Sequence, residues 1–216
     1  MLLNLDNLVT ENNLNIRGLI HIGSHYGQEY EAFKGHGCTN FLMFEPVPWT
    51  YDKLIEHIER CGTEGVKVVT ANCALGKSDE DKLTLYLDNR QQASTTALKP
   101  AKHLELYPDI LFDETIEVPQ RCLDSYLNET EDIDIKDFNM INIDVGGYEL
   151  EVFKGAEETL NHIDYVMTEV NREEMYENTC RIEDLDKYLG EYGFVRVATA
   201  WPNSMWGDAF YVKNGK

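Results

Sequence analysis

The chain has 216 residues, 43% of them hydrophobic and 27% charged, which is enough for one core and too little for two comfortable domains. Its 39 acidic residues against 19 basic ones give a formal charge of −20, which would repel a phosphate backbone and argues against a nucleic-acid substrate. No run reaches the roughly 20 apolar residues that a membrane span requires.

The first residues and the cysteines favour a cytoplasmic protein. The opening segment, MLLNLDNLVTENN, carries acids where a secretory leader would carry basic residues, so we expect no export. The five cysteines are widely spaced and form no C-x-x-C pair, which argues against a disulfide framework and against a zinc ribbon. A reducing compartment fits this pattern best.

Short apolar runs alternate with helical patterns in the first part of the chain. Strands are expected at residues 19–22, 40–44 and 66–71, and an alternating run at 83–87 is typical of a half-exposed strand. Helices are expected at 27–33 and at about 48–60, the second one initiated by Pro48.

The middle of the chain has a weaker pattern. Residues 88–113 contain polar clusters and two prolines without a clear period, and we expect them to form a long insertion that covers a substrate pocket. A short strand at 115–118 and a short helix at 123–127 follow, and the acidic stretch 128–137 is expected to be an exposed connector.

The pattern sharpens again toward the end of the chain. Strands are expected at residues 140–145, 165–170, 194–199 and 208–213, with helices at 149–160 and 182–192. Strands separated by helices predict a mostly parallel sheet that is covered on both faces. The last two strands are joined by a loop at 200–207 without a helix, which allows an antiparallel hairpin at one edge. No repeat or linker is visible, so a single domain over 1–216 is expected.

Ligands of such sheets bind outside the carboxyl ends of the strands. Here the first strand is followed by a Gly23-x-x-x-Gly27 turn, which lets backbone pass close to a ligand but lacks the G-x-G-x-x-G spacing of dinucleotide sites. Glu45 ends the second strand, where a carboxylate can accept hydrogen bonds from both hydroxyls of a ribose. The alternative for Glu45 is an N-cap acid before Pro46 and the helix that follows.

Seven segments in chain order, from about Leu19 over nearly the whole chain, resemble the FkbM family of S-adenosylmethionine-dependent methyltransferases. They are HIGSHYGQE, FEPVP, NCALG, LDSYL, IDVGGYELEVFKGA, TEVN and GDAFYV. The resemblance implies the Rossmann-like, seven-stranded class I methyltransferase fold, a mostly parallel sheet with an antiparallel last strand and helices on both faces. It also implies methylation of a hydroxyl group on a sugar, a glycan or a related small molecule.

The resemblance further implies a set of residues that bind S-adenosylmethionine. They are His21, Gly23, Ser24, His25, Gly27, Glu45, Asn72, Ala74 and Asp144. In this set the Gly23 to Gly27 loop lines the methionine end, Glu45 holds the ribose, and Asn72 and Ala74 lie near the adenine. His21 stands where many methyltransferases carry an acid, so backbone carbonyls and Asp144 would hold the amino group of the cofactor.

Methyl transfer needs an aligned acceptor oxygen and a group that takes up its proton. Asp144, at the end of the central strand, is the first catalytic candidate and Glu169 the second. The alternative for Asp144 is a cap of the helix that starts near Tyr148. Asp144, Glu169 and Asn171 together also offer the oxygen ligands of a magnesium site that would lower the pKa of the acceptor hydroxyl, the alternative being a polar pocket wall.

One departure from the family pattern keeps other functions open. Gly146 stands where the family usually carries Glu or Gln, and loss of that side chain would weaken a contact to cofactor or acceptor. The alternatives are a protein that holds the cofactor without turnover, a methyltransferase for a non-carbohydrate small molecule, and a Rossmann-type dehydrogenase. The missing G-x-G-x-x-G counts against the last of these.

Overall fold

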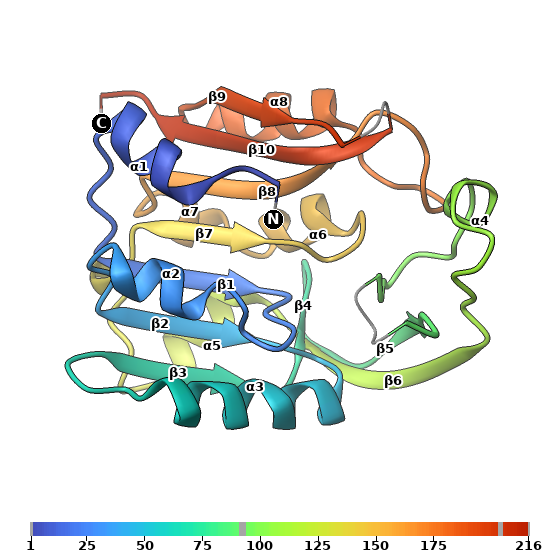
Figure 1. Cartoon of the computed structure of the whole chain (residues 1–216), viewed down its shortest axis with the longest axis horizontal. Helices are drawn as coiled ribbons and strands as arrows, with labels where there is room; N and C mark the ends of the chain where they lie inside the picture. The colour runs from blue at the N-terminus through green and yellow to red at the C-terminus, as the bar shows by residue number, and fades with distance from the viewer. Residues whose placement is uncertain (1, 91–93, 203–204, 216) are drawn as a thin grey trace.

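The computed structural model describes residues 2–90, 94–202 and 205–215. Its centre is a seven-stranded sheet in the order β3-β2-β1-β7-β8-β10-β9 (Figure 1). The strands are β1 (Gly18–Ile22), β2 (Asn40–Phe44), β3 (Lys67–Ala71), β7 (Met140–Ile143), β8 (Tyr165–Asn171), β9 (Phe194–Ala200) and β10 (Trp206–Lys213). β10 runs antiparallel to both of its neighbours, β8 and β9, and the other strand pairs of this sheet are parallel. This confirms the expected fold and its terminal hairpin, whose outer strand is β9.

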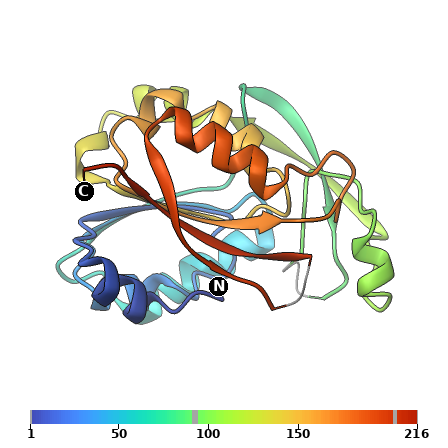
Figure 2. The same cartoon turned by 90° about the horizontal axis from the view of Figure 1, so that it is seen from above.

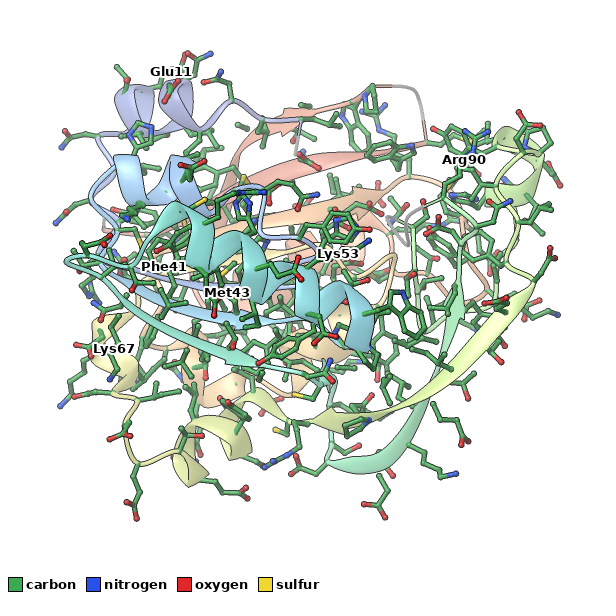
Figure 3. All side chains as sticks on the ribbon, turned by 60° about the horizontal axis from the view of Figure 1, so that its bottom comes forward. Glu11, Phe41, Met43, Lys53, Lys67 and Arg90 are labelled. Atoms are coloured by element: carbon green, nitrogen blue, oxygen red, sulfur yellow. The ribbon has the colours of Figure 1, made fainter. Side chains whose placement is uncertain are left out.

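Helices cover both faces of this sheet (Figure 2). One face carries α1 (Leu5–Asn12), α2 (Tyr30–Gly35) and α3 (Pro48–Cys61), and the other carries α5 (Leu123–Glu129), α6 (Glu149–Lys154), α7 (Glu157–Leu160) and α8 (Ile182–Glu191). Side chains of a strand alternate between the faces, so Phe41 and Met43 pack beneath α3 (Figure 3) while Leu42 and Phe44 join the opposite cluster. Burial of apolar side chains on both faces explains why these strands read as continuous hydrophobic runs.

The expected helix at 149–160 is interrupted and forms α6 and α7 instead. The interruption falls at Gly155, where a Cβ atom would collide with the backbone carbonyl of Gly76. The second piece is held by Asp124, whose carboxylate accepts hydrogen bonds from the N–H groups of Glu158 (2.8 Å) and Thr159 (2.9 Å). The close approach of Gly76 therefore requires glycine at the break, and Asp124 holds the start of α7.

A second, three-stranded sheet holds the apolar runs that the sequence places at 83–87 and 115–118. It consists of β4 (Ala74–Leu75), β6 (Glu114–Arg121) and β5 (Glu80–Leu87), in that order across the sheet. The connection between β5 and β6 contains α4 (His103–Leu106) and touches the rest of the protein through an isolated bridge between Pro100 and Tyr176. The small sheet and α4 lie beyond the ends toward which the parallel strands point (Figure 1).

A single-turn helix, η1 (Ile135–Asp137), leads into β7 and completes the list of elements. All five cysteines are free thiols. Among the described residues, no helix combines the length and the apolar character that crossing a lipid bilayer demands.

Candidate active site

A cavity of about 480 Å³ lies at the carboxyl ends of β1, β2, β7 and β8. This volume falls in the range of small-molecule sites. Its far wall is made by the connection between β5 and β6, which contributes Ser94, Thr96, His103 and Tyr107 among others. The cavity therefore lies between the strand ends and the insertion at 88–113, which the sequence predicts to cover a substrate pocket.

The loop after β1 is tied to the end of β2. The N–H groups of Gly23 and Ser24 both donate to the carbonyl of Phe44, at 3.0 and 2.9 Å. Gly23 has φ +76°, and a Cβ atom there would collide with the carbonyl oxygen of Asp144, so glycine is required for the ends of β1 and β7 to approach. Gly27 does not line the cavity, because it faces α3, where its Cβ would lie 2.7 Å from Leu54.

Glu45 is buried at the tip of β2 and lines the cavity. Its Oε2 accepts a hydrogen bond from the N–H of His25 and its Oε1 one from the N–H of Val47, both at 2.9 Å. Burial raises the pKa of Glu45 to about 7. The side chain thus holds the loop after β1 and the N–H of Val47, which is itself the N-cap residue of α3, so Glu45 is not the expected N-cap acid. Each of its oxygens retains a further acceptor position.

Asn72 lies behind Glu45, outside the cavity lining. Its amide donates to the carbonyl oxygens of Glu45 (2.8 Å) and Pro46 (3.1 Å), and so fixes the backbone that carries the carboxylate. Ala74 does line the cavity, as do the neighbouring Cys73 and Leu75. Of the nine residues expected to bind the cofactor, the structure brings all except Gly27 and Asn72 to the cavity wall.

His21 lines the same cavity from β1 and is 3% exposed. Its Nε2 lies 3.1 Å from Nδ2 of Asn142, which can only donate, so Nε2 accepts and the ring proton is assigned to Nδ1. Burial lowers the pKa of His21 below 6.5, so the ring is neutral at pH 7. A neutral imidazole does not supply the negative charge of an acid at this position.

Three carboxylates meet at the ends of β7 and β8. One oxygen each of Asp144, Glu149 and Glu169 can be chosen so that all lie within 4.8 Å of one another. Burial among protein groups raises the pKa of Asp144 to about 6 and that of Glu149 to about 7, and it raises that of Glu169 well above 4.5. Asp144 is itself reached by solvent through the cavity, whereas Glu149 is 0% exposed.

Glu149 is the residue of this cluster that sequence reasoning assigned only to the start of a helix. Its Oε1 accepts hydrogen bonds from the N–H groups of Val145 (3.0 Å) and Gly147 (3.2 Å). Its Oε2 is buried and has no hydrogen-bond partner among the described residues. The spacing of Asp144 and Glu149 around two glycines is the signal that could have placed both at one loop.

Asn171 and Asp208 adjoin the cluster from β8 and β10. Asn171 is 0% exposed, its amide donates to Oε1 of Glu169 at 3.4 Å, and its Oδ1 has no partner among the described residues. Asp208 lies opposite Glu169 in the β8–β10 register and accepts hydrogen bonds from the N–H groups of Leu2 and Leu3. Sequence reasoning missed Asp208, although an acid inside the last apolar run, GDAFYV, is an unusual position.

Aromatic side chains form the wall opposite the strand ends. His103 of α4 stacks on Tyr176 with ring centroids 5.5 Å apart, and Trp206 of β10 donates its indole N–H to the hydroxyl of Tyr107 at 2.9 Å. All four line the cavity. Trp201, by contrast, packs its ring against the guanidinium of Arg172 at 3.8 Å and does not line it.

Gly146 is packed against the segment that covers the cavity. Its carbonyl accepts a hydrogen bond from Oγ1 of Thr96 at 2.6 Å, and a Cβ atom on Gly146 would lie 2.8 Å from Cβ of Thr96. Its φ of +64° also disfavours any side chain. The Glu or Gln that the family resemblance implies for position 146 has no room here, because Thr96 occupies the space.

The cavity lining has many acidic side chains and no Lys or Arg among the described residues. It includes five carboxylates: Glu29, Glu45, Asp144, Glu169 and Asp208. A field of this sign attracts cations and repels phosphates and carboxylates.

Comparison with known proteins agrees with the resemblance seen in the sequence. The family described as methyltransferase FkbM domain matches residues 21–196. The chain is also similar to the 2-O-methyltransferase NoeI of Sinorhizobium fredii, with 29% identity over 110 residues, which are 51% of this chain and 43% of that protein. The chain thus matches less than half the length of this relative.

Solved structures share the fold at low sequence identity. A methyltransferase FkbM from Methylobacillus flagellatus KT superposes with a TM-score of 0.60 and 14% identity, over 91% of this chain and 43% of that one. The magnesium protoporphyrin IX methyltransferase ChlM of Synechocystis, with S-adenosylmethionine bound, gives 0.55 and 10% identity over 96% of this chain and 74% of that one. Sp1610 of Streptococcus pneumoniae, for which a tRNA (m1A22) methyltransferase activity is suggested, superposes with a TM-score of 0.54 and 14% identity. The match covers 99% of this chain and 71% of that one. The fold is that of class I methyltransferases, and the exclusion of nucleic acid stays a prediction from charge.

Proposed function

The chain belongs to the FkbM methyltransferase family, and from this premise we propose that it methylates a hydroxyl group of an uncharged sugar or glycan with S-adenosylmethionine. The observation that carries the proposal is the cavity at the strand ends, where Glu45 at the tip of β2 and Asp144 at the end of β7 line one space. This is the place where sheets of this kind bind their ligands.

The residues present fit the proposed cofactor. Glu45 offers acceptor positions for ribose hydroxyls, and Phe44, Cys73 and Leu75 give the cavity wall an apolar part for a flat ring. The acidic lining suits a ligand with a positive charge. When bound, S-adenosylmethionine supplies a methyl group on a positively charged sulfur.

Asp144 is the group that we assign to the acceptor's proton. Its carboxylate is accessible from the cavity, and a pKa of about 6, raised by burial, leaves it ionised but basic at neutral pH. In the proposed step the acceptor O–H bond breaks as its oxygen bonds to the methyl carbon. The proton moves to Asp144, and the carbon–sulfur bond breaks with its electrons left on sulfur.

The aromatic lining of the cavity supports a sugar as the acceptor. An aromatic face such as that of Trp206 packs against the apolar face of a sugar ring, while its indole N–H remains hydrogen-bonded to Tyr107. The absence of Lys and Arg from the described lining disfavours uronic acids, sugar phosphates and nucleic acid. The relative NoeI, whose name gives it as a 2-O-methyltransferase, points to the same kind of reaction.

Two assays test the proposal. Calorimetric titration with S-adenosylhomocysteine measures cofactor binding, and mass spectrometry measures methyl transfer to panels of neutral sugars, amino sugars, uronic acids and non-carbohydrate alcohols. We expect binding, together with turnover on neutral sugars or short glycans. Absence of binding contradicts the cofactor assignment, binding without turnover on any acceptor favours a non-catalytic protein, and turnover on other alcohols alone moves the acceptor outside carbohydrates.

A further inference from the structure

We propose that Asp144, Glu149 and Glu169, together with the amide oxygen of Asn171, bind a divalent cation of the Mg²⁺ and Mn²⁺ type at the inner end of the cavity. The expected magnesium set of Asp144, Glu169 and Asn171 is thereby extended by Glu149. Binding of the ion does not depend on methyl transfer, whereas its use on an acceptor hydroxyl rests on the proposed function.

The first argument is the distance between the carboxylates. Oxygens that share one ion with bonds of about 2.1 Å for Mg²⁺, or about 2.4 Å for Ca²⁺, lie at most roughly 4.2 to 4.8 Å apart. The three carboxylates already provide oxygens within 4.8 Å of one another.

The second argument is a pair of buried oxygens without partners. Oε2 of Glu149 and Oδ1 of Asn171 belong to residues that are 0% exposed, and neither oxygen accepts a hydrogen bond from the described residues. Leaving such an acceptor unpaired costs about 1–3 kcal/mol. Asn171 is uncharged, and the hydrogen bond from its Nδ2 to Oε1 of Glu169 (3.4 Å) holds the amide beside the carboxylates. It therefore points to a ligand independently of the cluster of acids.

The third argument is charge. The cluster gathers three acids, with Asp208 next to them, and no Lys or Arg appears among the described residues of the cavity wall. Either shared protons or a cation must neutralise such a group. All four ligand atoms are oxygens, which selects a hard ion over Zn²⁺ or Cu²⁺.

A cation here would hold the acceptor. An ion held by these residues would lie beside Asp144, the group assigned above to the acceptor's proton, and it would lower the pKa of a hydroxyl that it binds. The proton of that hydroxyl then passes to the oxygen of Asp144 that does not bind the ion. Bond making and breaking at carbon and sulfur are the same as without the ion.

The experiment measures metal binding separately from methyl transfer. Mn²⁺ is titrated into the full chain, with and without S-adenosylhomocysteine, and free Mn²⁺ is followed by electron paramagnetic resonance at pH 8. We expect one site, which Mg²⁺ displaces, and at least a tenfold weaker affinity in Glu169→Gln and in Asn171→Leu. Glu29→Gln, which removes a cavity carboxylate outside the cluster, serves as the matched control and should bind Mn²⁺ like the wild type.

The possible outcomes separate binding of the ion from its role in methyl transfer. No binding at millimolar Mn²⁺, or equal affinity in Glu169→Gln shown to be folded by its melting curve, overturns the site. Methyl transfer that EDTA leaves unchanged overturns the role of the ion and favours shared protons. Metal binding without turnover on any acceptor contradicts the proposed function and leaves the cation site intact.

Discussion

Replacement of Glu45 by Ala tests the proposed ribose contact most directly. A hydrogen bond to a charged acceptor contributes about 1.5–3 kcal/mol, and a ribose offers two hydroxyls to the free acceptor positions of Glu45. The released hydroxyls regain water in the variant, so we expect a net loss of about 1–3 kcal/mol, or a roughly 5- to 150-fold higher dissociation constant for S-adenosylhomocysteine.

The same replacement changes stability in two opposing ways. It leaves the N–H groups of His25 and Val47 without their acceptor, at about 1–3 kcal/mol each. It also removes a buried carboxylate whose pKa is raised from 4.5 to about 7, which corresponds to about 3 kcal/mol against the ionised form. Because these contributions are of similar size, the variant should remain folded at pH 8.

The assay is isothermal titration calorimetry at pH 8, with a melting curve of each protein. Glu56→Ala, which removes an exposed acid on α3, is the control and should bind the ligand like the wild type. A Glu45→Ala protein that is folded and has an unchanged dissociation constant would refute the ribose contact. Equal weakening in Glu56→Ala would show that the effect is one of net charge alone.

Three further predictions concern pH, packing and the acceptor. The folded-state pKa of Glu45 lies above its unfolded value, so the contribution of Glu45 to stability is complete below pH 4.5 and is lost as pH rises through about 7. Urea unfolding should show the wild type losing up to about 3 kcal/mol over this window relative to Glu45→Gln, and parallel curves would contradict the buried carboxylate. Gly146→Gln should destabilise by roughly 1–3 kcal/mol because of its positive φ and the contact with Thr96, whereas Gly190→Ala, in open space on α8, should stabilise by about 0.5–1 kcal/mol. A Gly146→Gln protein that melts like the wild type would show that the Thr96 segment moves aside. Trp206→Ala should raise the KM for a sugar acceptor at least severalfold without changing the affinity for the cofactor. A variant in which only the cofactor affinity falls would show that Trp206 does not contact the acceptor.

The main sheet could be predicted from the sequence because its signals are local. Apolar runs such as 40–44 are bounded by turns and followed by helical periods. They predict the strand, where it ends and which residue stands at its tip. Parallel strands place those tips at one edge, so Glu45 and Asp144 were expected together before any distance was known. The structure places both at one cavity.

What the sequence could not provide depends on contacts between distant segments. The pairing of β5 with β6 joins segments separated by the whole insertion, and so a separate small sheet was not foreseen. Gly155 ends a helix because Gly76 lies against it. Glu149 has a local signal as a helix-start acid, but its approach to Glu169 depends on the spacing of β7 and β8 and cannot be seen along the chain.

The hydrogen bond between Thr96 and Gly146 joins two parts that evolution could otherwise exchange separately. The segment around Thr96 belongs to the insertion, which would select the acceptor, and Gly146 belongs to the loop after β7, which follows the proposed base Asp144. A chimera that imports the insertion of another methyltransferase must therefore import the matching residue at position 146. In this protein, engineering of the insertion for a new acceptor should therefore vary position 146 together with it.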